Sequence, residues 1–84
     1  MAISSQYTVD GTPVKIASSN GTPIEVHVNA EADIWVGGST VTTSNGFLIN
    51  KGDEFHVTLA DHAELWAIHD GLVATTVYAL VSIL

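Results

Sequence analysis

The sequence has no cysteine, no arginine and only two lysines, Lys15 and Lys51, among its 84 residues. Without cysteine, neither a disulfide framework nor a thiolate-bound metal cluster can stabilise the domain. Nine acidic residues give a formal net charge of −7. Nucleic-acid binding and electrostatic adhesion to an anionic membrane both require clustered basic residues. We therefore expect neither nucleic acid nor a membrane as a partner.

Long apolar runs are also missing. The longest apolar segment, Leu72 to Leu84, spans thirteen residues, whereas a membrane-spanning helix needs about 20. The first residues contain no basic side chain and no apolar run of signal-peptide length. We expect no targeting segment and no membrane anchor.

Helical periodicity is absent, and short alternating runs separated by turn residues take its place. Asp10-Gly11, Asn20-Gly21, Asn45-Gly46 and Asp70-Gly71 supply the turns, because Asn, Asp and Gly tolerate the backbone angles of tight hairpins. The runs between them alternate apolar and polar residues, as half-buried strands do. They are expected at residues 6–9, 14–16, 24–28, 34–36, 47–49, 55–59, 65–68 and 72–84, and residues 41–43 are expected to be extended chain between two turns.

These features predict an all-β fold, a small antiparallel β-sandwich or barrel of about seven to eight short strands with no substantial helix. The whole chain, 1–84, is expected to form one domain. Within it, residues 1–22 are predicted to form an N-terminal hairpin or arm, and residues 23–84 the core.

The C-terminal segment is apolar on both faces of its predicted strand, and an 84-residue sandwich has only one interior. Two explanations remain open: a loop or the N-terminal segment covers the second face, or another copy or a larger partner does. An uncovered strand of this kind would aggregate. For the second explanation, the expected assembly-interface residues are Trp66, Val77, Tyr78, Leu80, Val81 and Ile83.

Four histidines and several acidic pairs were considered as catalytic or metal sites. His27, His56, His62 and His69 show none of the short spacings that place two imidazoles on one ion, although a site assembled from separate strands with Asp61 or Glu64 remains conceivable. We expect no metal and no other cofactor.

The carboxylate pairs Asp53-Glu54 and Asp61/Glu64 stand beside predicted turns, where solvated acidic residues are common. No serine, histidine and aspartate are grouped for nucleophilic catalysis. A β-domain of this length has little volume for a deep pocket. We expect no enzymatic activity and no small-molecule substrate.

Six aromatic residues raise the question of a sugar-stacking platform. Packing in the core or at an interface is the favoured explanation for Trp35 and Trp66, because each lies in the middle of an apolar run. The other four aromatics are Tyr7, Phe47, Phe55 and Tyr78.

Residues 34–49 read Ile-Trp-Val-Gly-Gly-Ser-Thr-Val-Thr-Thr-Ser-Asn-Gly-Phe-Leu-Ile. A turn at 51–54, an amphipathic strand at 55–59, an acidic turn at 61–64 and Leu-Trp-Ala at 65–67 follow. This order resembles that of small structural proteins of tailed bacteriophages, over residues 24–83. The loop that carries the resemblance is shaped by Gly37, Gly38, Asn45 and Gly46.

The resemblance implies a virion structural protein, made in the host cytoplasm and located on the capsid surface. Its expected role is that of a capsid decoration, or head-stabilising, protein that binds and bridges major capsid subunits. The resemblance also implies a homo-oligomer, a trimer, and no catalytic residues. A head–tail, tail or fibre accessory component, with or without carbohydrate binding, is the alternative. The net charge of −7 suits a decoration protein, because it discourages contact with DNA and with other virions.

Overall fold

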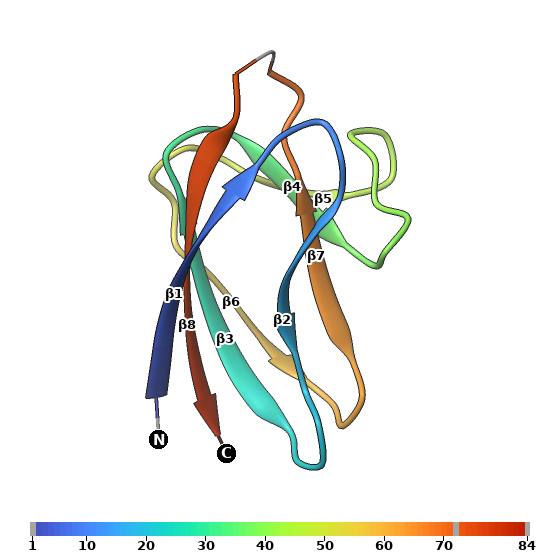
Figure 1. The fold of residues 1–84 in the computed structure, drawn as a ribbon, viewed down its shortest axis with the longest axis vertical. Helices are drawn as coiled ribbons and strands as arrows, with labels where there is room; N and C mark the ends of the chain where they lie inside the picture. The colour runs from blue at the N-terminus through green and yellow to red at the C-terminus, as the bar shows by residue number, and fades with distance from the viewer. Residues whose placement is uncertain (1, 72, 84) are drawn as a thin grey trace.

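The computed structural model describes residues 2–71 and 73–83, which form eight strands (Figure 1). Leu72 and Leu84, at the ends of the predicted C-terminal strand, lie outside the described residues. The strands are β1 (Ala2–Val9), β2 (Val14–Ser18), β3 (Ile24–Ala30), β4 (Ile34–Gly37), β5 (Phe47–Ile49), β6 (Phe55–Leu59), β7 (Glu64–Ile68) and β8 (Thr75–Ile83). Within these residues there is no helix of the length and apolarity needed to span a bilayer.

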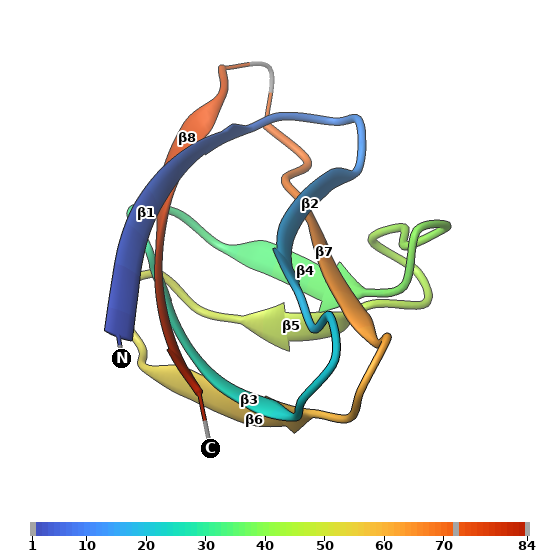
Figure 2. The same ribbon diagram turned by 60° about the horizontal axis from the view of Figure 1, so that its bottom comes forward.

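The strands form two four-stranded antiparallel sheets, ordered β1-β8-β3-β6 and β2-β7-β4-β5. Consecutive strands from β1 to β4 alternate between the two sheets, so the chain crosses the sandwich repeatedly (Figures 1 and 2). This strand order is that of a jelly roll, a double-sheet arrangement of two Greek keys. The predicted all-β sandwich is confirmed, at the upper end of the predicted number of strands.

The core follows from the alternation of the strands. In β3 the side chains of Ile24, Val26, Val28 and Ala30 point between the sheets and are at most 5% exposed. β4 and β7 bury alternate residues in the same way, because successive side chains of a strand point to opposite faces. The core between the sheets contains Val9, Ile16, Ala17, Ile24, Val26, Val28, Ala30, Ile34, Val36, Ile49, Leu59, Leu65, Ala67 and Val77.

The prediction of an N-terminal hairpin or arm is wrong. β1 pairs with β8, and β2 pairs with β7, so the two strands belong to different sheets. Val9 and Ile16 are both completely buried in the core. The Asp10-Gly11 turn therefore carries the chain across the sandwich, since burying Val9 and Ile16 from opposite sheets stabilises the core more than a local hairpin would.

The extended segment expected at 41–43 does not form a strand. These residues lie in the loop between β4 and β5. Val41 is β-branched and 3% exposed, but its burial comes from a fold-back of the loop. Strand propensity was overridden here by tertiary packing.

Candidate functional site

The outer surface of the β1-β8-β3-β6 sheet centres on Tyr78 and Leu80, and we call it the tyrosine face. Along β8 the side chains of Val77 and Ala79 enter the core, so those of Tyr78 and Leu80 point outward, where they are 37% and 41% exposed. In the antiparallel register, Tyr78 is flanked by Gln6 of β1 and by Asn29 of β3. An aromatic and an aliphatic side chain thus stand in a polar surround.

An open hollow of about 590 Å³ lies on the tyrosine face. It spans three strands, because the residues that line it include members of β1, β3 and β8. The outward side chains that line it belong to Ser4, Gln6, His27, Asn29, Glu54, Tyr78 and Leu80. Apart from Tyr78 and Leu80, these side chains are polar. The hollow offers a small apolar floor with hydrogen-bonding groups around it.

His27 forms a charged cluster at one side of this hollow. Its Nε2 lies 2.7 Å from Glu25 Oε1, and its Nδ1 lies 3.1 Å from Glu54 Oε1. The ring stacks on that of His56, across from it on β6, with centroids 5.4 Å apart. The hydrogen bonds to Glu25 and then Glu54 raise the pKa of His27 above its ordinary value of 6.5. The cluster therefore places two carboxylates and one protonatable imidazole beside Leu80.

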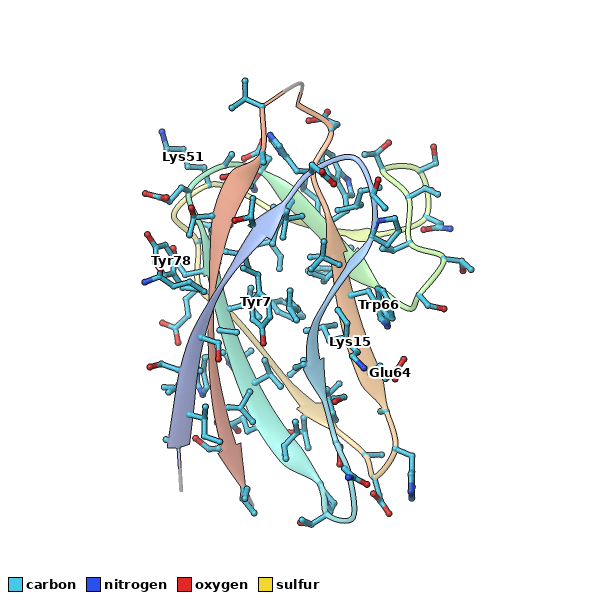
Figure 3. The ribbon with its side chains drawn as sticks, in the orientation of Figure 1. Tyr7, Lys15, Lys51, Glu64, Trp66 and Tyr78 are labelled. Atoms are coloured by element: carbon cyan, nitrogen blue, oxygen red, sulfur yellow. The ribbon has the colours of Figure 1, made fainter. Side chains whose placement is uncertain are left out.

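The outer surface of the β2-β7-β4-β5 sheet carries Trp35, Trp66 and Leu48, and we call it the tryptophan face. Both tryptophans are half-buried, and Leu48, paired with Trp35 across β4 and β5, is 44% exposed. The Nε1–H of Trp66 donates a hydrogen bond to Glu64 at 3.1 Å, and Lys15 Nζ lies 3.7 Å from the same carboxylate. Figure 3 shows Trp66 and Tyr78 on opposite sides of the sandwich.

The loop between β4 and β5 folds back onto the tryptophan face. A Cβ at Gly46 would come within 2.7 Å of Trp35 Cβ and 2.8 Å of Val41 Cγ2, so only glycine fits there without displacement. Val41 is buried although it does not belong to the core between the sheets. The loop thus brings Val41 and Trp35 close to the same glycine, Gly46.

Three of the four residues expected to shape this loop, Gly37, Asn45 and Gly46, have close neighbours in it. Asn45 Oδ1 accepts a hydrogen bond from the Thr42 N–H at 2.7 Å, which closes the turn. A Cβ at Gly37 would lie 3.2 Å from Val41 Cγ2, whereas one at Gly38 would meet no atom within 4 Å. Asn45, Gly37 and Gly46 therefore contribute to the fold-back, and Gly38 lies in open space.

The residues predicted for the assembly interface are not brought together on one surface. Tyr78 and Leu80 belong to the tyrosine face, and Trp66 to the tryptophan face on the other sheet. Val81 is half-buried against the core, and Ile83, near the end of β8, is 49% exposed. Val77 is completely buried. The inclusion of Val77 was therefore wrong, because its side chain has no surface to offer a partner.

The histidines and carboxylates have structural partners, and among the described residues no group of three or more is arranged to hold a metal ion. His69 Nδ1 lies 2.8 Å from the Asp33 carbonyl oxygen, and His62 Nδ1 lies 3.2 Å from Asp61. Asp61 also accepts a hydrogen bond from the Gly21 N–H at 2.6 Å. Glu64 and Glu54 make the contacts with Trp66 and His27 described above.

The six aromatic residues do not form a common platform. Tyr7 packs between the sheets, and the tryptophans and Tyr78 lie on opposite outer faces (Figure 3). Phe47 and Phe55 form a separate pair with ring centroids 5.4 Å apart, where the edge strands β5 and β6 approach each other.

Two features of these surfaces, the cluster around His27 and the exposed side chain of Leu48, were not predicted from the sequence. The contact of His27 with Glu25 could have been predicted, because the two residues are two apart on the polar side of one strand. The contact with Glu54 required the pairing of β3 with β6. Leu48 was also missed, because its short apolar run gave no indication of which side chain faces solvent.

The sequence matches no known family of proteins, and a comparison with curated proteins finds no match. The fold, however, has a solved counterpart. It is similar to a chain from the Bacillus endospore appendages, which form a novel family of disulfide-linked pili. The TM-score is 0.67 at 12% sequence identity, and the likeness covers 96% of this chain and 81% of that one.

At this identity the likeness shows a shared fold alone. The resemblance to phage proteins finds no counterpart in any of these comparisons. None of the 84 residues is a cysteine, so disulfide linkage does not carry over.

Proposed function

We propose that this chain is a structural subunit that assembles non-covalently with further subunits into a larger surface structure. The observation that carries this proposal is the exposure of large apolar side chains on the outer faces of both sheets. Tyr78 and Leu80 are 37% and 41% exposed on one face, and Leu48 is 44% exposed on the other. Burying such side chains against a neighbour is the main favourable term in protein association.

The contrast between the buried inner residues and the accessible outer residues of β8 supports the same proposal. Its inner residues Val77 and Ala79 are at most 3% exposed, and its outer residues stay accessible. The explanation that the chain covers both faces of its C-terminal strand therefore fails for Tyr78 and Leu80. A surface that the subunit cannot cover by itself is suited to a partner.

The structural neighbour supports an assembled, extracellular location. That protein belongs to pili on Bacillus endospores, and this chain is similar to it in fold. In this chain the contacts between subunits would have to be non-covalent, because no cysteine is present. We propose a structural role without enzymatic activity.

A narrower proposal rests on the sequence order of residues 24–83. It supports a subunit that decorates the capsid of a tailed phage, as a homo-oligomer bound to the major capsid protein. The two proposals share self-association and differ in the need for a shell.

Sedimentation equilibrium of the purified protein between about 1 µM and about 1 mM tests the proposal. We expect the mean mass to rise with concentration above that of one subunit. A monomer throughout this range, together with no binding to capsids in co-sedimentation, would overturn it. Electron microscopy of the protein alone then separates the two versions, because filaments or rings without a shell favour the appendage.

A further inference from the structure

The geometry points to a head-to-tail contact in which the tyrosine face of one copy docks on the tryptophan face of the next. This inference rests on the proposed function and names the partner and the surfaces. Leu48 of one copy enters the hollow floored by Tyr78 and Leu80 of the other, and Trp66 packs beside it. The occupant of the hollow is thus a second copy of this chain.

The apolar groups of the two faces match in kind. The hollow, of about 590 Å³, is lined by Tyr78 and Leu80 together with polar side chains. Leu48 projects outward from β5, an edge strand of the other sheet, and 44% of it is accessible. When an exposed apolar side chain enters an open hollow, both lose contact with water. The removal of apolar surface from water favours the contact.

The charges of the two faces disfavour one of the possible pairings, the contact between two tyrosine faces. The tyrosine face carries Glu25 and Glu54 around His27, whereas on the tryptophan face Lys15, one of only two lysines in the chain, offsets the charge of Glu64. Two tyrosine faces in contact would bring together four carboxylates and only two His27 imidazoles of the two copies, and like charges that meet at an interface repel each other. The head-to-tail pairing instead places Lys15 near carboxylates.

Lys15 is available for this purpose. Its contact with Glu64 is 3.7 Å long, and the two side chains are 46% and 45% exposed. An exposed ion pair of this kind contributes little stability by itself. Lys15 can therefore turn towards Glu25 or Glu54 of the neighbouring copy at small cost.

The positions of the two faces on opposite sides of the subunit determine which kind of assembly forms. They lie on the outer sides of the two sheets, so each copy keeps one free face after the first contact (Figures 2 and 3). A contact between different surfaces repeats until it closes into a ring or continues as a filament. Contact between two tryptophan faces, by comparison, would stop at a dimer and leave Leu80 in water.

A mixing experiment with two single variants tests the inference. Leu80→Glu adds a charge to the tyrosine face, and Leu48→Glu adds the same charge to the tryptophan face. We expect each substitution to weaken self-association by about a hundredfold. Val73→Glu is the matched control, because Val73 is 79% exposed between β7 and β8 and lies on neither face; this variant should assemble like the unchanged protein.

The equimolar mixture of Leu80→Glu and Leu48→Glu is the decisive sample. The first variant retains an intact tryptophan face and the second an intact tyrosine face, so the mixture should form a two-subunit complex that neither variant forms alone. Circular dichroism verifies that each variant is folded, and Leu80→Thr with Leu48→Thr repeats the test without added charge.

The possible failures are distinguishable. If the unchanged protein never associates, the proposed function is overturned and this inference with it. If the unchanged protein associates but the mixture stays monomeric, or if Leu80→Glu associates normally, the head-to-tail contact is overturned while the structural role stands.

Discussion

Val77 and Tyr78 are neighbours in β8 with opposite environments: Val77 is 0% exposed between the sheets, and Tyr78 is 37% exposed on the outer face. The inward side chains of β8 thus belong to the core, and its outward side chains belong to the surface. Folding and assembly can therefore be separated by substitutions one residue apart.

Val77→Ala should destabilise the fold, and Tyr78→Thr should weaken assembly. The loss of two buried methyl groups from Val77 is expected to lower the free energy of unfolding by about 2 kcal/mol. Tyr78→Thr should change it by less than about 1 kcal/mol, because threonine suits an outward strand position. Urea unfolding at low concentration measures the first effect and sedimentation the second. Equal effects of both variants on unfolding would contradict the assignment of the two faces.

Gly46→Ala should disturb the loop between β4 and β5. The added Cβ would lie 2.7 Å from Trp35 Cβ and 2.9 Å from the Thr42 carbonyl oxygen. Crowding of this kind costs about 1–3 kcal/mol, and displacement of the loop should expose Trp35 and shift the tryptophan fluorescence. Gly38→Ala is the control: no atom lies within 4 Å of its Cβ position, so its stability should stay within about 0.5 kcal/mol. A harmless Gly46→Ala would disprove the close packing of this loop.

Stability should decrease as the pH rises above 6.5 because of His27. Its pKa is raised above 6.5 in the folded protein by Glu25 and Glu54, so the folded state binds the proton more tightly than the unfolded state. The stabilisation is complete below pH 6.5 and is lost as the pH rises through the pKa of the folded state. NMR titration of the imidazole protons measures that pKa directly.

Two variants verify the cause of this pH dependence. Glu25→Gln should lower the pKa of His27, because it removes the largest contribution. His27→Gln should remove the corresponding slope from the free energy of unfolding. An unchanged pKa in Glu25→Gln would argue against the contact between the two side chains.

Truncation after Tyr78 should prevent folding as well as assembly. β8 is an inner strand, hydrogen-bonded to β1 on one side and to β3 on the other. The truncation removes Ala79, which is 3% exposed, and leaves the ends of both neighbouring strands unpaired. We expect an insoluble product, detected by fractionation of expressing cells. A folded, soluble truncation, shown by circular dichroism, would contradict this role of β8.

The strands themselves could be predicted because local alternation determines them. Ile24, Val26 and Val28 alternate with polar residues, and the structure buries all three. The apolar character of both faces of β8 could also be predicted, because it can be recognised without knowing the partner strands. The course of residues 41–43 could not be predicted, since Val41 is buried without strand pairing, in a loop that brings it close to Gly46.

The sequence by itself determined the fold class, the absence of disulfides, the acidic charge and the existence of a strand with more apolar surface than one core can cover. Only the tertiary structure decided that β1 and β2 belong to different sheets, that Val77 faces inward and Tyr78 outward, and that His27 lies between Glu25 and Glu54. The physical reason is that alternation is a property of neighbours along the chain. The sheet that a strand joins, and the face that it turns to solvent, depend on contacts between residues far apart in sequence.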